Sequence, residues 1–313
     1  MPSSYRAGLA LLVLQACANP DPTVKPPADR VHAIQPRDAK PHAPPPARAA
    51  FTAEDYATHI AALRTRLAAH GLADLTIHIE EPFVVVGDGT AAGLERSAGT
   101  VRWAADQLEH HLFEARPTRI LDIFLFSTAA SYEAGVRALT GESPSTPYGF
   151  YSHASPGLYM NIATGGGTLV HEIVHPYVEA DFPDAPAWLN EGLGSLYEQS
   201  AEPDGHIVGL TNWRLAGLQR AIAKGVVPSF QTLARMDSAT FYAESSGTNY
   251  SQARYLMYYL QEHDRLQTFY RAFRAARERD PTGYATLVHT LGDPDMAAFE
   301  RDWRAWVAKL TFP

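Results

Sequence analysis

The segment His171-Glu172-Ile173-Val174-His175 constrains the fold of this chain more than any other feature. On a helix, residues four positions apart lie about 40° apart around the axis and one turn apart along it, so His171 and His175 can direct two imidazoles at one cation. Glu172 projects beside that point, where it could take a proton from a water molecule. Two surface histidines on a helix face would give the same spacing. The pattern predicts a helix that carries half of a metal site.

Local signals bound this helix. Gly165, Gly166 and Gly167 break the chain before it, and Thr168 is predicted to cap it. Pro176 is predicted to truncate or kink the helix directly after the second histidine, because proline lacks a backbone donor and its ring clashes with the preceding turn.

The third ligand is expected from the segment 186–198, which reads PAWLNEGLGSLYE. Pro186 suits the first turn of a helix, and the loop 176–185 allows that helix to fold back across the first. Glu191 then lies among apolar neighbours, where a carboxylate needs a partner and a cation would serve; a solvated carboxylate is the alternative. Two histidines and one glutamate form a ligand set of catalytic zinc, so Zn2+ is the expected cofactor.

These motifs, His-Glu-x-x-His followed by Trp-Leu-Asn-Glu-Gly at 188–192, resemble those of the gluzincin metallopeptidases. The resemblance is greatest to the aminopeptidase-like group and to related bacterial proteins with domains of unknown function. It implies that His171, His175 and Glu191 bind Zn2+ and that Glu172 is the general base of a zinc metallopeptidase.

A third motif also matches. Tyr250 opens the segment YSQARYLMYYL, 59 residues after Glu191. By resemblance, Tyr250 would hydrogen-bond the oxyanion of the tetrahedral intermediate. Tyrosines at helical spacing in the same segment leave a core position as the alternative.

Two departures from the family pattern matter. Aminopeptidases of this group usually carry Gly-x-Met-Glu-Asn on an edge strand, whereas residues 157–162 read GLYMNI and hold no Glu. A strict aminopeptidase is therefore not expected, and this strand would be free to pair with an extended peptide. Second, Ser195 stands where some relatives have a carboxylate that orients a zinc-bound histidine. Ser195 is a weaker partner, and a backbone carbonyl is the alternative.

Hydrophobic periodicity predicts an α+β fold: a mixed α/β lobe at 51–163, a mainly helical lobe at 164–313, and the zinc site in the cleft between them. The resemblance implies a thermolysin-like catalytic domain. Helices are expected at 53–70, 92–114 and 129–139, and strands at 75–79, 83–86, 120–126 and 157–162. Beyond Gly167 only helices are expected.

The N-terminus predicts export. Residues 1–17 have a basic start and a short apolar run, and Leu14-Gln15-Ala16-Cys17 resembles a bacterial lipobox. We expect a lipoprotein-type signal peptide, a proline-rich linker at 18–50, and a protein held in the bacterial cell envelope by a lipid on Cys17. An ordinary signal peptide would instead give a secreted or periplasmic protein.

The net charge of −8, without a run of Lys or Arg, argues against a nucleic-acid partner. The expected function is zinc-dependent hydrolysis of peptide bonds in a peptide or protein substrate. A non-catalytic peptidase-fold envelope protein that binds a peptide or a protein partner is the alternative, and a zinc hydrolase acting on another substrate is a further one. The sequence gives no oligomeric state.

Other polar residues are weaker candidates. His153 precedes the strand at 157–162 and could reach the cleft. The pair His110-His111 is expected at the surface. Glu179, Asp181 and Asp184 are expected to be solvated.

Overall fold

The computed structural model describes residues 51–244 and 247–312. The expected signal peptide and linker, with Cys17, lie outside these residues. The first half contains α1 (Ala53–Ala69), β1 (Thr76–Glu80), β2 (Phe83–Gly87), α2 (Ala91–His111), β3 (Leu121–Phe126), α3 (Ala129–Thr140), β4 (Gly149–Ser152) and β5 (Gly157–Asn161). Every helix and strand expected here is present to within a few residues, and β4 is an addition.

The strands form one sheet in the order β1-β2-β3-β5-β4. Strands β2, β3 and β5 are parallel, whereas β1 and β4 join the two edges in the antiparallel sense. The expectation that 157–162 is an edge strand is therefore wrong, because β5 lies between β3 and β4. The edge beside it is β4, whose four residues follow a segment rich in Gly, Pro and Ser and are too few to show a strand period.

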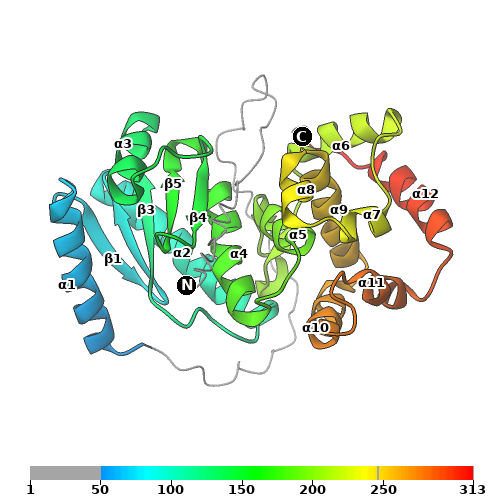
Figure 1. Ribbon diagram of the computed structural model, residues 1–313, viewed down its shortest axis with the longest axis horizontal. Coiled ribbons are helices and arrows are strands. Elements are labelled where there is room, and N and C mark those ends of the chain that lie inside the picture. Colours follow the sequence, from blue (N-terminus) through cyan, green and yellow to red (C-terminus); the bar gives the residue numbers. More distant parts are fainter. Residues whose placement is uncertain (1–50, 245–246, 313) are drawn as a thin grey trace, which may run out of the picture.

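The alternation of side chains along the strands gives the sheet two apolar faces. Val84 and Val86 face one side, where α1 and α3 pack. Phe83 and Val85 face the other side, where α2 and α4 pack. Figure 1 shows the sheet between these helices, with α4 and α5 at the centre of the molecule.

The second half is mainly helical. Its helices are α4 (Gly167–Asp181), α5 (Ala187–Tyr197), α6 (Arg214–Ala223), α7 (Phe230–Ala234), α8 (Ser238–Ala243), α9 (Thr248–Glu262), α10 (Leu266–Ala276), α11 (Tyr284–Leu291) and α12 (Met296–Val307). The expectation of helices alone is wrong, since β6 (Ser200–Ala201) and β7 (Val208–Gly209) form an antiparallel pair. Two-residue strands are too short to leave a periodic signal.

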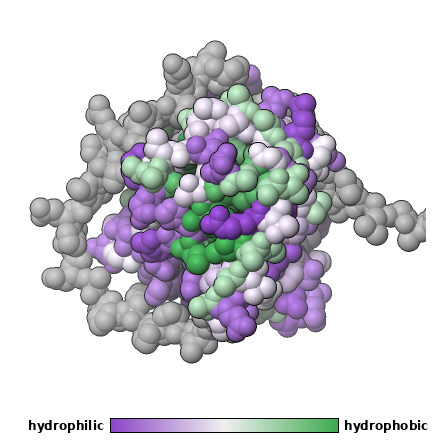
Figure 2. Space-filling model, turned by 90° about the vertical axis from the view of Figure 1, so that its left-hand side faces the viewer, coloured by the Kyte–Doolittle hydropathy of each residue, from purple (hydrophilic) through white to green (hydrophobic). Residues whose placement is uncertain are grey.

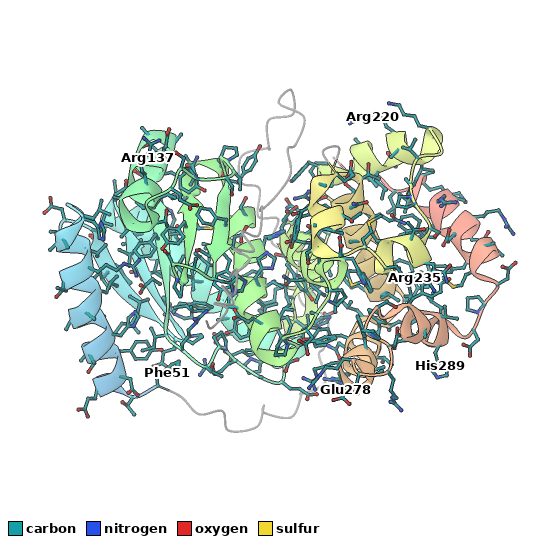
Figure 3. The ribbon with its side chains drawn as sticks, viewed as in Figure 1. Phe51, Arg137, Arg220, Arg235, Glu278 and His289 are labelled. Carbon is teal, nitrogen blue, oxygen red and sulfur yellow. The ribbon has the colours of Figure 1, made fainter. Side chains whose placement is uncertain are left out.

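A single apolar core joins the two halves. It runs from Phe83 in the sheet through Leu169 of α4 and Leu193 of α5 to Val307 of α12. Side chains fill the space between sheet and helices, while charged residues such as Arg137, Arg220 and Glu278 point outward (Figure 3). The fold is thus a small mixed sheet followed by helices, as expected. The division into lobes at 163 and 164 stays a prediction, because the core crosses it.

The end of the molecule formed by α1 and β1 is shown in Figure 2, where apolar side chains gather near the centre of a largely polar face. Ile79 of β1 is 47% exposed. Among the described residues, no helix has both the length and the apolar character needed to cross a bilayer.

Candidate metal centre

Helix α4 begins and ends differently from the prediction. Its N-cap is Gly166, without a side-chain cap, and Thr168 lies within the first turn. Pro176 lies inside the helix, which continues to Asp181. Pro176 has no N–H to offer the carbonyl of Glu172, yet α4 is buried between the sheet and α5 along most of its length. Tertiary burial therefore outweighs the local cost of the proline.

The three expected ligands meet at one point. His171 and His175 come from α4 and Glu191 comes from α5. One donor atom from each lies within 4.8 Å of the other two, and His171 Nε2 is 3.2 Å from Glu191 Oε2. Their exposed fractions are 0%, 9% and 3%. The fold-back of α5 across α4 thus places two imidazoles and a carboxylate together in the interior.

Each imidazole has a side-chain partner at its Nδ1 atom. His171 Nδ1 lies 3.0 Å from Glu198 Oε1, and His175 Nδ1 lies 2.9 Å from Asn190 Oδ1. Because both partners are acceptors, each Nδ1 carries the proton as donor. This leaves Nε2 of each ring as the atom available to an ion, as in metal-bound histidines whose other nitrogen donates to a carboxylate or carbonyl.

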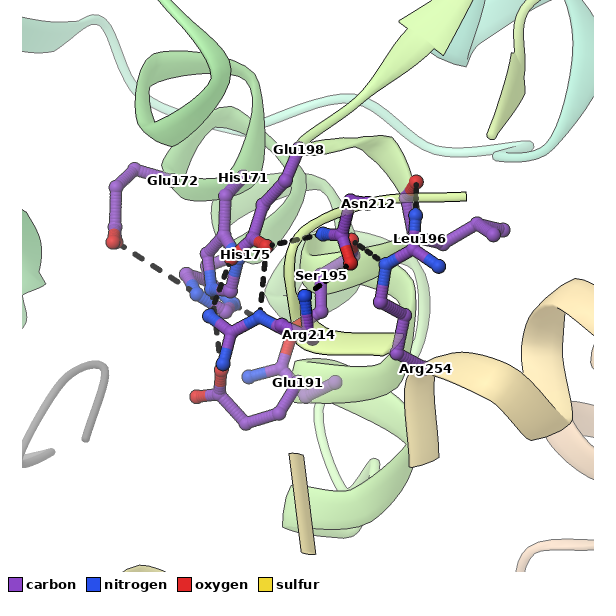
Figure 4. Close-up of polar contacts among 11 residues, drawn as sticks. His171, Glu172, His175, Glu191, Ser195, Leu196, Glu198, Asn212, Arg214 and Arg254 are labelled. Atoms are coloured by element: carbon purple, nitrogen blue, oxygen red, sulfur yellow. Dashed lines mark hydrogen bonds and ion pairs between the residues drawn. The ribbon is translucent and has the colours of Figure 1, made fainter. Parts of the chain in front are cut away.

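Glu198, rather than Ser195, is the carboxylate partner of His171. The expectation for Ser195 is wrong: its Oγ makes no hydrogen bond within residues 51–244 and 247–312. Glu198 lies two turns after Glu191 and accepts hydrogen bonds from Arg214 Nε, Arg214 Nη2 and Asn212 Nδ2 at 2.8, 2.6 and 3.0 Å. Figure 4 shows this network behind His171. The bidentate pair lets Glu198 stay ionised in the interior, and its pKa is lowered: burial opposes this, but Arg214 and His171 outweigh it.

Helix α5 approaches His171 closely. A Cβ added to Gly194 would lie 3.0 Å from both Cδ2 and Nε2 of the ring. Arg254 of α9 donates to the carbonyls of Ser195 and Leu196 in the last turn of α5. The glycine and the arginine together fix α5 against the histidine.

Glu172 lies beside the three ligands but is not one of them. It is 1% exposed, and its Oε2 is 3.7 Å from His175 Nε2. Burial raises the pKa of Glu172; the two histidines and a backbone hydrogen bond from Tyr151 of β4 act in the opposite direction. The expected base therefore sits between the ligands and the edge strand.

Glu191 has the opposite electrostatic balance. Burial alone would raise its pKa, but His175, His171 and a hydrogen bond from Tyr242 outweigh burial and lower it. Tyr242 Oη donates to Glu191 Oε1 at 2.9 Å. Tyr242 could not be predicted from the sequence, because it lies on the six-residue helix α8, which has too few residues for a periodic signal.

Tyr250 lies near this group, in the first turn of α9, and is 1% exposed. Its ring centroid is 6.2 Å from that of Tyr242, and the Arg214 guanidinium lies 5.4 Å from its centre. The structure therefore brings Tyr250 into the surroundings of the ligands, among aromatic residues.

The weaker candidates lie elsewhere. His153 is 3.6 Å from Glu179, which also accepts a hydrogen bond from Tyr151. Asp181 is buried and paired, so the expectation of a solvated side chain is wrong for it, whereas Asp184 is 80% exposed. His110 is exposed, as expected.

The donor set fits a zinc ion. It offers two imidazole nitrogens and one carboxylate oxygen, which is a combination used by catalytic zinc sites that keep one position open. His171 Nε2 faces Glu191 Oε2, His175 Nε2 faces Glu172 Oε2, and the pKa of Glu191 is lowered. Among the described residues, no other group of three or more histidine, cysteine or acidic side chains meets in this way.

A comparison with known protein families finds one match. Residues 163–283 match the model of a family described as Protein of unknown function (DUF1570). The matched segment contains the three expected ligands, Glu172 and Tyr250, covers most of the helical half, and excludes the five-stranded sheet. No curated protein matches the chain.

Proposed function

We propose that this protein is a zinc-dependent peptide hydrolase of the gluzincin type. The observation that carries the proposal is the meeting of His171, His175 and Glu191 around one buried point, with a further carboxylate, Glu172, beside them. A buried carboxylate outside the donor set has no role in holding the ion, whereas it has the position of a general base.

The roles of the side chains follow from their places. A bound zinc ion would supply Lewis-acid activation of a water molecule and of the substrate carbonyl. Glu172 accepts the proton of the attacking water and returns it to the leaving amine. Tyr250 is assigned to the oxyanion by family resemblance, and its place near Tyr242 supports that assignment.

Strand β4 supports a peptide as substrate. It is an edge of the sheet, and its Tyr151 backbone hydrogen-bonds Glu172. A strand edge beside the base offers backbone groups to an extended chain. The substrate peptide would therefore bind along β4, in place of the strand that the sequence suggested.

The test combines metal content with activity. Purified protein should contain one zinc per chain by elemental analysis, and His175→Ala should lose it. Glu172→Gln should keep the zinc and lose about 10²- to 10⁴-fold in the rate of peptide-library cleavage, since proton transfer by a positioned base contributes about that much. Zinc without cleavage in the parent would favour a peptide-binding protein. No zinc, even after incubation with added metal, would reject the proposal.

Membrane anchoring is proposed on the sequence alone. Mass spectrometry of the protein made in a bacterial cell would show whether Cys17 begins the mature chain and carries lipid. A mature chain that begins elsewhere without lipid would support release into the periplasm or the medium.

A further inference from the structure

We infer that Tyr242 is a positioning residue for the third metal ligand, and that it leaves Glu191 Oε2 alone to face the ion. This inference rests on the proposed zinc site. It assigns a role to a residue that neither the sequence motifs nor the family resemblance indicates.

The two carboxylate oxygens of Glu191 have different partners. Oε2 lies 3.2 Å from His171 Nε2, on the side of the shared point. Oε1 accepts the hydrogen bond from Tyr242 Oη at 2.9 Å. A carboxylate with both oxygens free can turn either or both toward a cation, whereas the hydroxyl of Tyr242 holds one of them away.

Tyr242 is itself well fixed. Its ring lies edge-on to Phe241 at 5.4 Å, and Phe241 is fully buried. The carbonyl of Phe241 accepts a hydrogen bond from Asn249 Nδ2, which connects α8 to the first turn of α9. A side chain held by such packing can orient a neighbouring carboxylate, which a mobile surface tyrosine cannot do.

The two tyrosines of the site therefore have separate tasks. Tyr242 acts through Glu191, and Tyr250 is the group proposed to meet the substrate. The rings are 6.2 Å apart. Tyr250→Phe is thus the comparison variant, because it removes the same atom from a neighbouring ring and keeps the Tyr242–Glu191 hydrogen bond.

The experiment measures zinc affinity by competition with a chromophoric chelator for the parent, Tyr242→Phe and Tyr250→Phe. Removing an outer partner of a metal ligand typically costs 10- to 100-fold in affinity, so Tyr242→Phe should bind zinc about 10- to 100-fold more weakly. Tyr250→Phe should lose less zinc affinity than Tyr242→Phe, because the hydrogen bond from Tyr242 to Glu191 stays in place. Equal affinities in all three proteins, or equal losses in both variants, would overturn the inference while leaving the zinc site standing.

A second readout separates positioning from a general structural effect. In protein loaded with Co2+, whose visible absorption depends on its ligands, Tyr242→Phe should give a spectrum that differs from that of the parent. A Co2+ spectrum identical to that of the parent would overturn the inference even if the variant were less stable. If the parent protein binds neither metal, the proposed function is rejected. The measurement on the parent therefore tests the zinc site separately from the role of Tyr242.

Discussion

At the residue scale, the centre depends on how buried charges share partners. The Glu198 carboxylate accepts hydrogen bonds from three side chains, those of His171, Arg214 and Asn212. An ionised carboxylate and a guanidinium both lose hydration on burial, and their bidentate contact offsets that loss. The same carboxylate accepts from His171 Nδ1. Glu198 therefore both pairs with Arg214 in the core and orients the ligand His171.

Replacing Glu198 by Gln should therefore weaken the metal site. The amide keeps the size of the side chain but removes the negative charge that faces His171 and Arg214. We expect zinc affinity to fall by about 10- to 100-fold, measured by chelator competition.

Ser195→Ala is the matched control for this change. Ser195 stands one turn after Glu191, and its Oγ has no hydrogen-bond partner among the residues described here. Zinc affinity should stay within about twofold, as no ligand partner is lost. Equal losses in the two variants would mean that Glu198 does not orient His171.

At the scale of elements, the edge strand is fastened to the motif helix. Glu179 lies one turn after His175 on α4 and accepts a hydrogen bond from Tyr151 Oη at 2.7 Å. Arg119 and His153 flank the same carboxylate at 3.9 and 3.6 Å. The contact fixes β4 against α4 next to Glu172, so it bears on where a peptide along β4 would meet the base.

The pH dependence of stability should report this contact. The neighbouring His153, aided by the hydrogen bond from Tyr151, lowers the pKa of Glu179 to about 2 from 4.5. A lowered folded-state pKa stabilises the protein above the unfolded value and loses that effect as the pH falls through the folded value. The parent should thus be more stable than Glu179→Gln at about pH 5, and the difference should shrink as the pH approaches 2.

Urea unfolding at a series of pH values measures this difference. Glu133→Gln is the control, because Glu133 pairs with Arg137 on the same kind of helix but both are more than half exposed. Exposed pairs of this type contribute about 0.3–0.5 kcal/mol, so its pH dependence should be slight. A difference for Glu179→Gln that does not change with pH would show that the charge of Glu179 is not what holds β4.

The elements also show where sequence reasoning stops. Long amphipathic helices and β-branched strands follow from side-chain period, and the motif spacing predicts that α5 returns to α4. The predictions that Thr168 caps α4 and that Pro176 truncates it are wrong, because burial of the helix outweighs local preference. Glu198 lies inside the motif segment already singled out, but its role depends on Arg214, which reaches it only after the chain has passed through β6 and β7. Such partners are set by tertiary structure.

At the scale of the whole molecule, Asp181 joins parts that are distant in sequence. It ends α4, and its carboxylate accepts hydrogen bonds from the backbone N–H groups of Glu114 and Ala115, which follow α2, at 3.1 and 2.7 Å. From the helical half, Tyr270 Oη and Arg274 Nη1 of α10 donate to it at 2.9 and 2.5 Å. One carboxylate thus connects the sheet half, the motif helix and the helical half.

Asp181→Asn should for this reason destabilise the entire fold. The amide can satisfy only part of four donors, and it leaves Arg274 with less compensating charge in a site where the aspartate side chain is 1% exposed. Breaking a buried pair of this kind costs about 3 kcal/mol. Asp184→Asn, three residues on, changes an 80% exposed side chain 3.9 Å from Arg277 and should cost less than about 0.5 kcal/mol. In urea unfolding, the midpoint should fall for Asp181→Asn with an unchanged slope, since the surface exposed on unfolding stays the same. A midpoint shift no larger than that of Asp184→Asn would mean that the apolar core alone holds the halves together, and that the four donors to Asp181 find other partners when its charge is removed.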